Sequence, residues 1–317
     1  IKIMTLKIAV QMDPMENVNI AGDSSFALML AGQARGFELF HYDVKNLTYT
    51  AGGRLTTPAR PVTVQKVQGD HFTFGDEVKL DLGRDIDVVL MRQDPPFDVG
   101  YITACHLLER IENETLVVNN PVSVRNAPEK VMVLDYAEFM PPTLITRDLD
   151  EVRAFQAEHG GVVVKPLHGN GGKAIFSVPA SGDNISALFE MFNQTWPEPH
   201  MVQPFLPEVH EGDKRIVLVD GVVAGAINRV PAKGETRSNM HVGGRPEKVA
   251  LDARDHEICA AIGPLLREKG QIFVGIDVIG GNLTEINVTS PTGLMELERF
   301  DGINVTAKIW EAIEARR

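Results

Sequence analysis

The stretch that decides the fold of this chain spans residues 272–288 and reads Ile-Phe-Val-Gly-Ile-Asp-Val-Ile-Gly-Gly-Asn-Leu-Thr-Glu-Ile-Asn-Val. Two apolar strands flank Gly280-Gly281-Asn282, a turn sequence typical of an antiparallel hairpin. With a three-residue loop, Asp277 lies opposite Glu285, and Asn287 points to the same face. Opposed carboxylates repel unless a cation lies between them, and Mg²⁺ prefers oxygen ligands of these types. The hairpin therefore predicts a metal site, with a solvated polar face as the alternative.

A second segment, residues 162–173, places Lys165 at the end of an apolar strand and beside a glycine cluster. Glycines let backbone N–H groups approach phosphate oxygens closely. The segment is not a Walker P-loop, which requires glycine at Leu167 and serine or threonine at Ala174. Because residues 174–178 resemble a strand, we expect a hairpin that lies over phosphates, as the glycine-rich loop of protein kinases does. A plain glycine-rich turn is the alternative.

The composition restricts the class of protein. The chain has 317 residues, a length typical of about two domains. Its 44% hydrophobic and 23% charged residues exclude wholesale disorder. Its net charge of −12 argues against general binding to nucleic acid or to an anionic membrane. A phosphate-handling site would therefore need cations gathered locally.

Candidate cations come from several separate segments, which suits a polyphosphate together with a carboxylate substrate. For any one of them, a solvated surface charge is the alternative. The stretch 229–244 has little apolar patterning and indicates a long mobile loop of functional importance. The candidate cations are Lys130, Lys165, Lys214, Arg215, Arg229, Arg237 and Arg245.

Several features predict a cytoplasmic protein. The two cysteines, Cys105 and Cys259, are far apart and have no metal-ligand spacing, which suits a reducing compartment. No apolar run approaches the roughly 18 residues of a membrane span, and no signal-peptide pattern is present at the N-terminus given. Sequence signatures of serine hydrolases, zinc proteases and dinucleotide-binding folds are absent.

The pattern along the chain predicts an α/β fold with an N-terminal doubly wound parallel sheet, followed by a two-part α+β region. Short apolar strands alternate with helices over the first 120 residues, and Asn126-Ala127-Pro128-Glu129-Lys130 has the pattern of a helix start. In the last third, Asp220-Gly221 predicts another hairpin. The expected domains are residues 1–125, 126–200 and 201–317.

Lys130, Lys165 with its glycine-rich hairpin, and the hairpin of Asp277, Glu285 and Asn287 follow one another in an order that resembles ATP-grasp ligases. Within that superfamily the chain resembles the bacterial glutathione synthetase family nearly end to end. The segments that carry this resemblance are 12–14, 23–26, Met91-Arg92-Gln93-Asp94-Pro95-Pro96-Phe97-Asp98, 212–215, 234–239, 243–245, and Thr284-Glu285-Ile286-Asn287-Val288-Thr289-Ser290-Pro291-Thr292.

The resemblance implies an N-terminal pre-ATP-grasp substrate domain, a central ATP-grasp lid subdomain and a C-terminal ATP-grasp subdomain. It also implies roles for individual residues. ATP would be bound by Lys130, Lys165, Gly169, Gly171, Gly172, Gln203, Phe205, Leu206, Asp213 and Lys214. Catalysis would depend on Arg215, Arg229 and Asn239. The other substrates would contact Asp13, Arg92, Arg237, Gly243, Gly244, Ser290 and Thr292.

The implied reaction joins γ-glutamylcysteine to glycine with ATP and Mg²⁺ or Mn²⁺. A carboxylate has no leaving group, so its phosphorylation to an acyl phosphate precedes attack by the amine. The loop at 229–244 would then act as a lid that excludes water. The resemblance further suggests a homo-oligomer, a dimer or tetramer. Another ATP-grasp carboxylate–amine ligase and a non-catalytic nucleotide-binding regulator are the alternatives.

Overall fold

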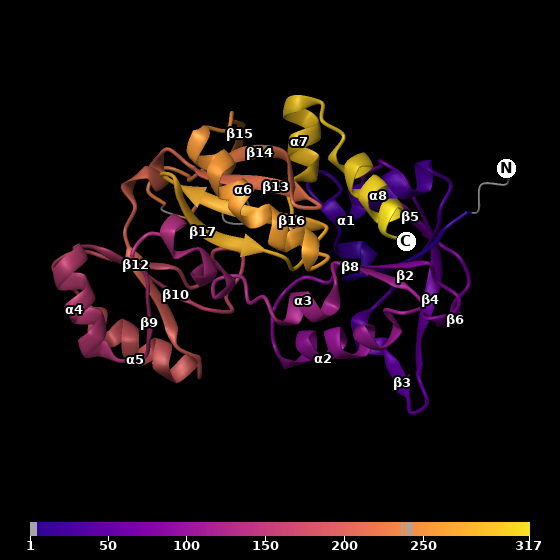
Figure 1. The fold of residues 1–317 in the computed structure, drawn as a ribbon, viewed down its shortest axis with the longest axis horizontal. Helices are drawn as coiled ribbons and strands as arrows, with labels where there is room; N and C mark the ends of the chain where they lie inside the picture. The colour runs from indigo at the N-terminus through magenta and orange to yellow at the C-terminus, as the bar shows by residue number, and fades with distance from the viewer. Residues whose placement is uncertain (1–4, 236, 240–242) are drawn as a thin grey trace.

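The computed structural model describes residues 5–235, 237–239 and 243–317. Three sheets follow one another along the chain, and the part built by the central residues stands apart from the N-terminal part as a separate lobe (Figure 1). Among the described residues, we find no helix with the length and apolar character needed to span a membrane.

The N-terminal part is a mixed sheet with helices on both faces, and its strands β2-β1-β7-β8 are parallel. This arrangement confirms the predicted doubly wound layer. Antiparallel strands, which the sequence pattern did not predict, extend it beyond β2. The elements are β1 (Lys7–Gln11), η1 (Met15–Asn17), α1 (Ser24–Ala34), β2 (Glu38–Tyr42), η2 (Val44–Asn46), β3 (Thr48–Thr50), β4 (Arg54–Val64), β5 (Phe72–Phe74), β6 (Val78–Asp81), β7 (Val88–Met91), α2 (Val99–Leu108), η3 (Glu109–Ile111), β8 (Leu116–Val118) and α3 (Pro121–Arg125).

The central lobe is a four-stranded antiparallel sheet in the order β11-β10-β12-β9. Its two helices share one apolar core with the sheet, in which Val152, Phe189 and Val202 are buried. The opposite face of the sheet is therefore free to form part of a cavity. The elements are η4 (Met132–Phe139), β9 (Leu144–Thr146), α4 (Leu149–His159), β10 (Val162–Pro166), β11 (Phe176–Val178), α5 (Ile185–Thr195), β12 (His200–Pro204) and η5 (Pro207–His210).

The C-terminal part is a five-stranded antiparallel sheet in the order β15-β14-β13-β16-β17. Helix α6 covers one face, where Ile216, Ile262 and Ile276 are buried in a common core. The elements are β13 (Asp213–Val219), β14 (Val222–Val230), β15 (Arg245–Lys248), α6 (Ala253–Glu268), β16 (Phe273–Ile279), β17 (Asn282–Asn287), α7 (Leu294–Asp301) and α8 (Val305–Arg316).

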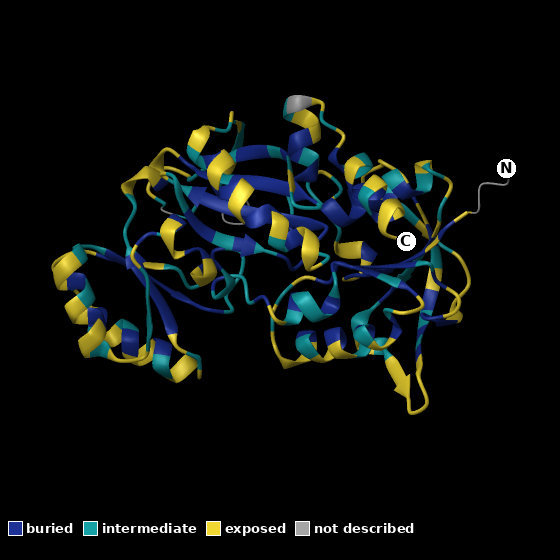
Figure 2. Ribbon diagram, in the orientation of Figure 1, coloured by how far each residue is buried: buried dark blue, intermediate teal, exposed yellow. Residues whose placement is uncertain are grey.

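The N-terminal and C-terminal parts share an apolar core. The last helix, α8, returns to the N-terminal part, where buried Trp310 donates a hydrogen bond to the carbonyl of Leu28. Phe26 of α1 and Val217 of β13 belong to the same core. Figure 2 shows the central strands of both parts as buried ribbons beneath exposed helix faces. This shared core fixes the end of β7 against the C-terminal sheet.

The helix start predicted at residues 126–130 is partly right. Residues 126–131 are turns and coil after α3, which begins at Pro121 behind the Asn120 cap. The Pro128 carbonyl accepts from the N–H groups of Val131 and Met132, and the 3-10 helix η4 follows at once. The carbonyl of Glu129 accepts a hydrogen bond from the Ile286 N–H, so a long-range contact also shapes the backbone at this point.

The hairpin loop of β16 and β17 is also shorter than predicted. Gly280 and Gly281, at φ +55° and +75°, form a two-residue turn, which favours positive φ at both positions. A bulge then absorbs Thr284, so that Asp277 still pairs with Glu285 as predicted. A three-residue loop would pair Val278 with Thr284 and Ile279 with Leu283, whereas in the structure they pair with Leu283 and Asn282. The shared face of the carboxylates is as predicted.

Candidate active site

A cavity of about 510 Å³ lies where the central sheet, the C-terminal sheet and the segment after β7 meet. Six cationic and five acidic side chains line it. Its net charge is thus slightly positive in a chain of net charge −12. The cations are gathered locally, as an anionic substrate requires.

The C-terminal sheet presents Asp277, Glu285 and Asn287 to the cavity. The Asn287 amide donates to the Asp277 Oδ2 atom at 3.2 Å, so both side chains lie on one face. Glu285 pairs with the Lys130 ammonium, with 3.2 Å between Nζ and Oε1. The three predicted oxygen donors are thus together on one wall.

Asp277 is surrounded by guanidinium groups. Arg215 donates to Oδ1 at 2.5 Å and to Oδ2 at 3.0 Å, and the Arg229 Nη2 atom lies 3.0 Å from Oδ1. Burial alone would raise the pKa of Asp277, but these two guanidinium groups hold the pKa well below its usual range. Asp277 is therefore ionised at neutral pH.

A second buried carboxylate, Asp213, shares the Arg229 guanidinium. The Asp213 Oδ2 atom accepts from Arg229 at 2.5 Å and from the Ser238 hydroxyl at 2.7 Å. Burial, which outweighs the attraction of Arg229, raises the pKa of Asp213 to about 6, and the nearby negative charge of Asp277 adds to the increase. The hydroxyl contact ties the 237–239 loop to β13.

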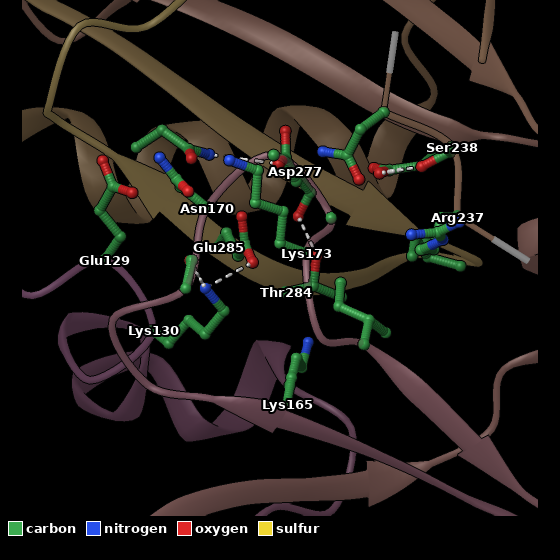
Figure 3. A pocket seen from close by; sticks show the side chains of 18 of the residues that line it. Glu129, Lys130, Lys165, Asn170, Lys173, Arg237, Ser238, Asp277, Thr284 and Glu285 are labelled. Atoms are coloured by element: carbon green, nitrogen blue, oxygen red, sulfur yellow. Dashed lines mark hydrogen bonds and ion pairs between the residues drawn. The ribbon is translucent and has the colours of Figure 1, made fainter. Parts of the chain in front are cut away.

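Lys165 has a different environment. It is only 7% exposed, and its ammonium forms no ion pair or hydrogen bond with the residues that the structure describes. Figure 3 shows it pointing into the cavity. Burial lowers the pKa of Lys165, which means that the cavity lacks a full counter-charge for it. An anion bound in the cavity would supply that charge.

The glycine loop and the 237–239 loop meet across the cavity. Gly172 has φ +75°, and a Cβ atom there would lie 2.5 Å from the Asn239 Oδ1 atom. Only glycine allows this approach without displacing Asn239. The ammonium of Lys130 also donates to the Gly169 carbonyl at 2.6 Å.

The far end of the cavity is formed by the strand–loop junction at Gln203, Phe205 and Leu206. Gln203 is buried, and its amide donates to the Thr143 hydroxyl at 2.9 Å. Apolar Val163, Ile175 and Leu206 line this end as well. These apolar side chains suit an aromatic heterocycle.

Most of the candidate residues predicted from the sequence lie along the cavity wall. They are Lys130, Lys165, Gly169, Gly171, Gly172, Gln203, Phe205, Leu206, Asp213, Arg215, Arg229, Arg237, Asn239, Asp277, Glu285, Asn287, Ser290 and Thr292.

Lys214 lies on the opposite face of the sheet. Successive residues of a strand point to opposite sides, so Asp213 and Arg215 face the cavity whereas Lys214 faces α6. Its ammonium lies 2.8 Å from an Asp252 oxygen and 2.5 Å from an Asp255 oxygen. The side chain of Lys214 thus does not line the cavity, and its expected role in nucleotide binding stays a prediction from the sequence.

Four candidate substrate contacts also lie outside the cavity wall. Buried Arg92 donates to the Ser25 hydroxyl at 2.9 Å and to the Pro291 carbonyl at 3.0 Å, so it braces the 290–292 segment from behind. Asp13 accepts from the Asp94 N–H at 2.8 Å. Gly243 and Gly244 follow the 240–242 segment, which is outside the described residues, and do not line the cavity. The predicted lid, 229–244, begins as the end of β14, and part of it is likewise outside the described residues.

Sequence reasoning missed Glu129, which lines the cavity (Figure 3). It also missed the wall residues Asp94, Asn170 and Lys173 as individual candidates. The only sequence signal for Glu129 was its position next to Lys130. The contacts that place it are made with residues 286–289, far away along the chain.

The donor set fits a hard divalent cation such as Mg²⁺. Across residues 5–235, 237–239 and 243–317, no group of three or more His, Cys, Asp or Glu side chains is placed to hold a metal ion. The cavity instead offers two carboxylates and the amide oxygen of Asn287, an all-oxygen set that leaves positions for phosphate oxygens and water. Such an incomplete site suits a cation that arrives with a nucleotide.

Comparisons with known proteins agree with this geometry. Residues 6–125 match the family model of the prokaryotic glutathione synthetase N-terminal domain. Residues 129–302 match that of the prokaryotic glutathione synthetase ATP-grasp domain. The chain belongs to the prokaryotic glutathione synthetase family. It is therefore an enzyme, an ATP-dependent ligase of glutathione synthesis, and the predicted family and enzyme class are confirmed.

Relatives of this family match over the full length. The chain is 56% identical to the glutathione synthetase of Rhodopseudomonas palustris, covering 99% of this chain and 100% of the relative. It is 54% identical to that of Brucella melitensis, covering 99% and 100% of the two chains. It is 44% identical to that of Yersinia pestis, covering 98% of each.

Solved structures show the fold. The D-cycloserine synthetase DcsG matches with a TM-score of 0.67 at 17% identity, covering 98% of this chain and 99% of that one. The ATP-grasp ligase PsnB, complexed with a minimal precursor, matches with a TM-score of 0.63 at 19% identity, covering 99% of each. At these identities the likeness confirms the predicted ATP-grasp architecture alone.

Proposed function

We propose that this enzyme joins the cysteinyl carboxylate of γ-glutamylcysteine to the amine of glycine, with ATP and Mg²⁺, through an acyl phosphate. One observation carries the proposal. The buried ammonium of Lys165, which has no ion pair among the described residues, comes from the central sheet and faces the Asp277–Glu285–Asn287 wall of the C-terminal sheet across one cavity. A polyphosphate would supply the negative charge that Lys165 lacks, and a divalent cation bound with it would supply the positive charge that the carboxylate wall requires.

Each part of the cavity would bind a different part of ATP. The apolar end at Gln203, Phe205 and Leu206 would hold the adenine, with Asp213 near the ribose. Lys130 and Lys165 would contact the phosphates, and the backbone of Gly169, Gly171 and Gly172 would cover them. These contacts hold the γ-phosphate in line with the substrate carboxylate, which is the main requirement of phosphoryl transfer.

Arg215 and Arg229 would spread the charge that develops on the transferring phosphoryl group, since a planar guanidinium can bridge two oxygens. Ser290 and Thr292, at the wall that Arg92 braces, would hold the peptide substrate. Arg237 and Asn239 would cover the reacting groups and exclude water, because an acyl phosphate hydrolyses readily.

Mg²⁺ would be held by Asp277, Glu285 and Asn287 and, when bound, would neutralise the charge of the phosphates. Mn²⁺ offers the same coordination chemistry. An ion at this wall would compete with Arg215 and Lys130 for the carboxylates, which frees both cations to turn toward the phosphates.

Release of ADP tests the proposed substrates. We expect substantial ADP release only with γ-glutamylcysteine and glycine together, slow release with γ-glutamylcysteine alone, and none with glycine alone. Equal release with an unrelated amino-acid pair would instead favour another ATP-grasp carboxylate–amine ligase. A regulator without catalytic activity would release no ADP with any of them, and the intact oxygen-donor wall argues against that alternative.

Isotope transfer tests the acyl phosphate. If the carboxylate attacks the γ-phosphate, ¹⁸O in the cysteinyl carboxylate of γ-glutamylcysteine must appear in the phosphate released. Label that stays in glutathione alone would exclude direct phosphorylation of this carboxylate. The homo-oligomeric state, the cytoplasmic location and the three domain boundaries stay predictions from the sequence.

A further inference from the structure

Glu129 is anchored to the C-terminal sheet through one carboxylate oxygen. Its Oε1 atom accepts from the N–H groups of Val288 and Thr289, both at 3.0 Å, and from the Thr289 hydroxyl at 2.5 Å. Three donors on one oxygen fix the orientation of the whole carboxylate. The other oxygen, Oε2, forms no hydrogen bond or ion pair within the part of the chain that the structure describes.

The other buried or half-buried carboxylates of the cavity already have cationic partners. Asp277 has Arg215 and Arg229, and Asp213 has Arg229. Glu285 has the neighbouring Lys130, whose ammonium is thereby committed away from Glu129.

Asp94 also lines the cavity without an ion pair among the described residues, but it is the more exposed of the two. Within the described cavity wall, Glu129 is therefore the less exposed of the two carboxylates that lack an ion pair. Burial raises the pKa of Glu129, which agrees with a carboxylate that lacks a counter-charge.

The carboxylate of Glu129 and the ammonium of Lys165 are opposite charges that both lack an ion pair among the described residues. One wall of the cavity has an unpaired buried cation, which suits the phosphates of a nucleotide. The opposite wall has an unpaired carboxylate aimed by three hydrogen bonds, which suits an ammonium group. We infer that Glu129 binds the ammonium of the acceptor amino acid, glycine in the reaction proposed above, and orients its nitrogen for attack.

The position of Glu129 favours the acceptor over the other ammonium in the reaction, that of the γ-glutamyl group. Glu129 is next to Lys130 in the chain. It accepts hydrogen bonds from residues in the segment 286–289, which adjoins Glu285 and contains Asn287. The amine that attacks must lie close to the phosphorylated carboxyl group, and therefore close to this wall. The γ-glutamyl ammonium is separated from that carboxyl group by several bonds and would lie farther away.

The test compares wild type with Glu129→Gln. The glutamine keeps an oxygen for the Val288 and Thr289 donors, but it replaces the free Oε2 atom by an amide NH₂ that repels an ammonium. We expect the KM for glycine to rise roughly tenfold to a hundredfold, the loss typical of one hydrogen bond to a charged group. The KM values for ATP and γ-glutamylcysteine should stay near those of wild type.

Hydroxylamine provides a second nucleophile that is uncharged at neutral pH. It should trap the acyl phosphate as a hydroxamate equally well in wild type and Glu129→Gln, because a neutral amine does not require the carboxylate. Glu138→Gln is the matched control, since Glu138 is an exposed carboxylate nearby in the chain and outside the cavity wall. This control should leave every constant unchanged.

Three outcomes would overturn the inference. An unchanged KM for glycine would exclude an ammonium site at Glu129. Equal losses with glycine and hydroxylamine would assign Glu129 to support of the 288–292 segment only. A raised KM for γ-glutamylcysteine alone would move the site to the γ-glutamyl ammonium. Failure of the proposed substrates themselves is distinguishable, because wild type would then form no glutathione.

Discussion

Arg215 and Asp277 form a two-point ion pair across the neighbouring strands β13 and β16, with Nε 2.5 Å from Oδ1 and Nη2 3.0 Å from Oδ2. The two residues are directly opposite in the antiparallel register. Gly275 lies beside them, and a Cβ atom there would come within 2.8 Å of the Arg215 side chain. The guanidinium is thus held flat against the sheet, with Asp277 and the cavity in reach.

This pairing gives Arg215 two functions, to orient Asp277 and to stabilise the transferring phosphoryl group. A lysine keeps the charge but cannot bridge two oxygens. We expect Arg215→Lys to lower kcat on the order of 10²-fold while changing the KM for ATP little, because the bridged charge develops mainly in the transition state. Steady-state kinetics with saturating γ-glutamylcysteine and glycine measures both constants. Arg245→Lys, at an exposed position outside the cavity, is the control. Unchanged turnover with a raised KM for ATP would assign Arg215 to binding of the ground state.

A substitution at Glu285 tests the proposed Mg²⁺ site formed by Asp277, Glu285 and Asn287. Glu285→Gln keeps an oxygen for the Lys130 ammonium but removes the negative charge that a divalent cation requires. We expect turnover to fall on the order of 10³-fold and the Mg²⁺ concentration for half-maximal activity to rise. Thermal unfolding of the protein without ligands should differ from wild type by about 1 kcal/mol or less. An unchanged Mg²⁺ dependence would remove Glu285 from the metal site.

The shared face of Asp277, Glu285 and Asn287 could be predicted because side chains alternate with a period of two along a strand. The bulge at Thr284 could not, because it depends on how a two-residue glycine turn fits the twist of the two strands. The error in loop length was compensated by the bulge, which restored the register at Glu285. The same alternation, applied at Lys214, would have separated it from Asp213 and Arg215.

Glu129 and Arg92 illustrate what the sequence alone could not supply. The local pattern around Glu129 favours a helix, but hydrogen bonds to residues about 160 positions away fix it in a turn on the cavity wall. Arg92 belongs to a segment that resembles the family, yet it supports Pro291 from behind the wall. In both cases the packing between distant segments decides which groups the side chain contacts. The periodicity of the local sequence cannot predict such contacts.

The contact between the two loops gives a steric prediction. Gly171 and Gly172 both have positive φ, at +59° and +75°, so alanine is strained at either position by about 1 kcal/mol. Only at Gly172 would the added Cβ atom also collide with Asn239, whereas nothing lies within 4 Å at Gly171. We therefore expect Gly172→Ala to release more phosphate per glutathione formed than Gly171→Ala does, because the loops cannot close over the acyl phosphate. Equal ratios in the two variants would show that this contact does not protect the intermediate.

The raised pKa of Asp213 predicts that pH has opposite effects on stability and on activity. Its pKa in the folded protein is raised to about 6, above the value near 3.9 of an unfolded chain. Between these two values the folded state binds a proton that the unfolded state has lost. The contribution of Asp213 to stability is therefore present below pH 4 and is lost as the pH rises through about 6. Protonation, however, removes the charge that holds Arg229 and accepts from Ser238, so activity should fall below about pH 6.

Comparison of wild type with Asp213→Asn separates these effects from those of other titrating groups. The asparagine cannot ionise, so the difference in unfolding free energy between the two proteins should depend on pH between about 4 and 6 and become constant above 7. As the pH falls through this interval, the activity of wild type should fall as well. The variant should have low activity at every pH, because its uncharged asparagine resembles the protonated aspartic acid throughout. Denaturant unfolding and initial rates at matched pH values measure the two quantities. A stability difference that stays constant from pH 4 to pH 7 would mean that the carboxylate keeps its ordinary pKa, and that Arg229 and Ser238 compensate its burial completely.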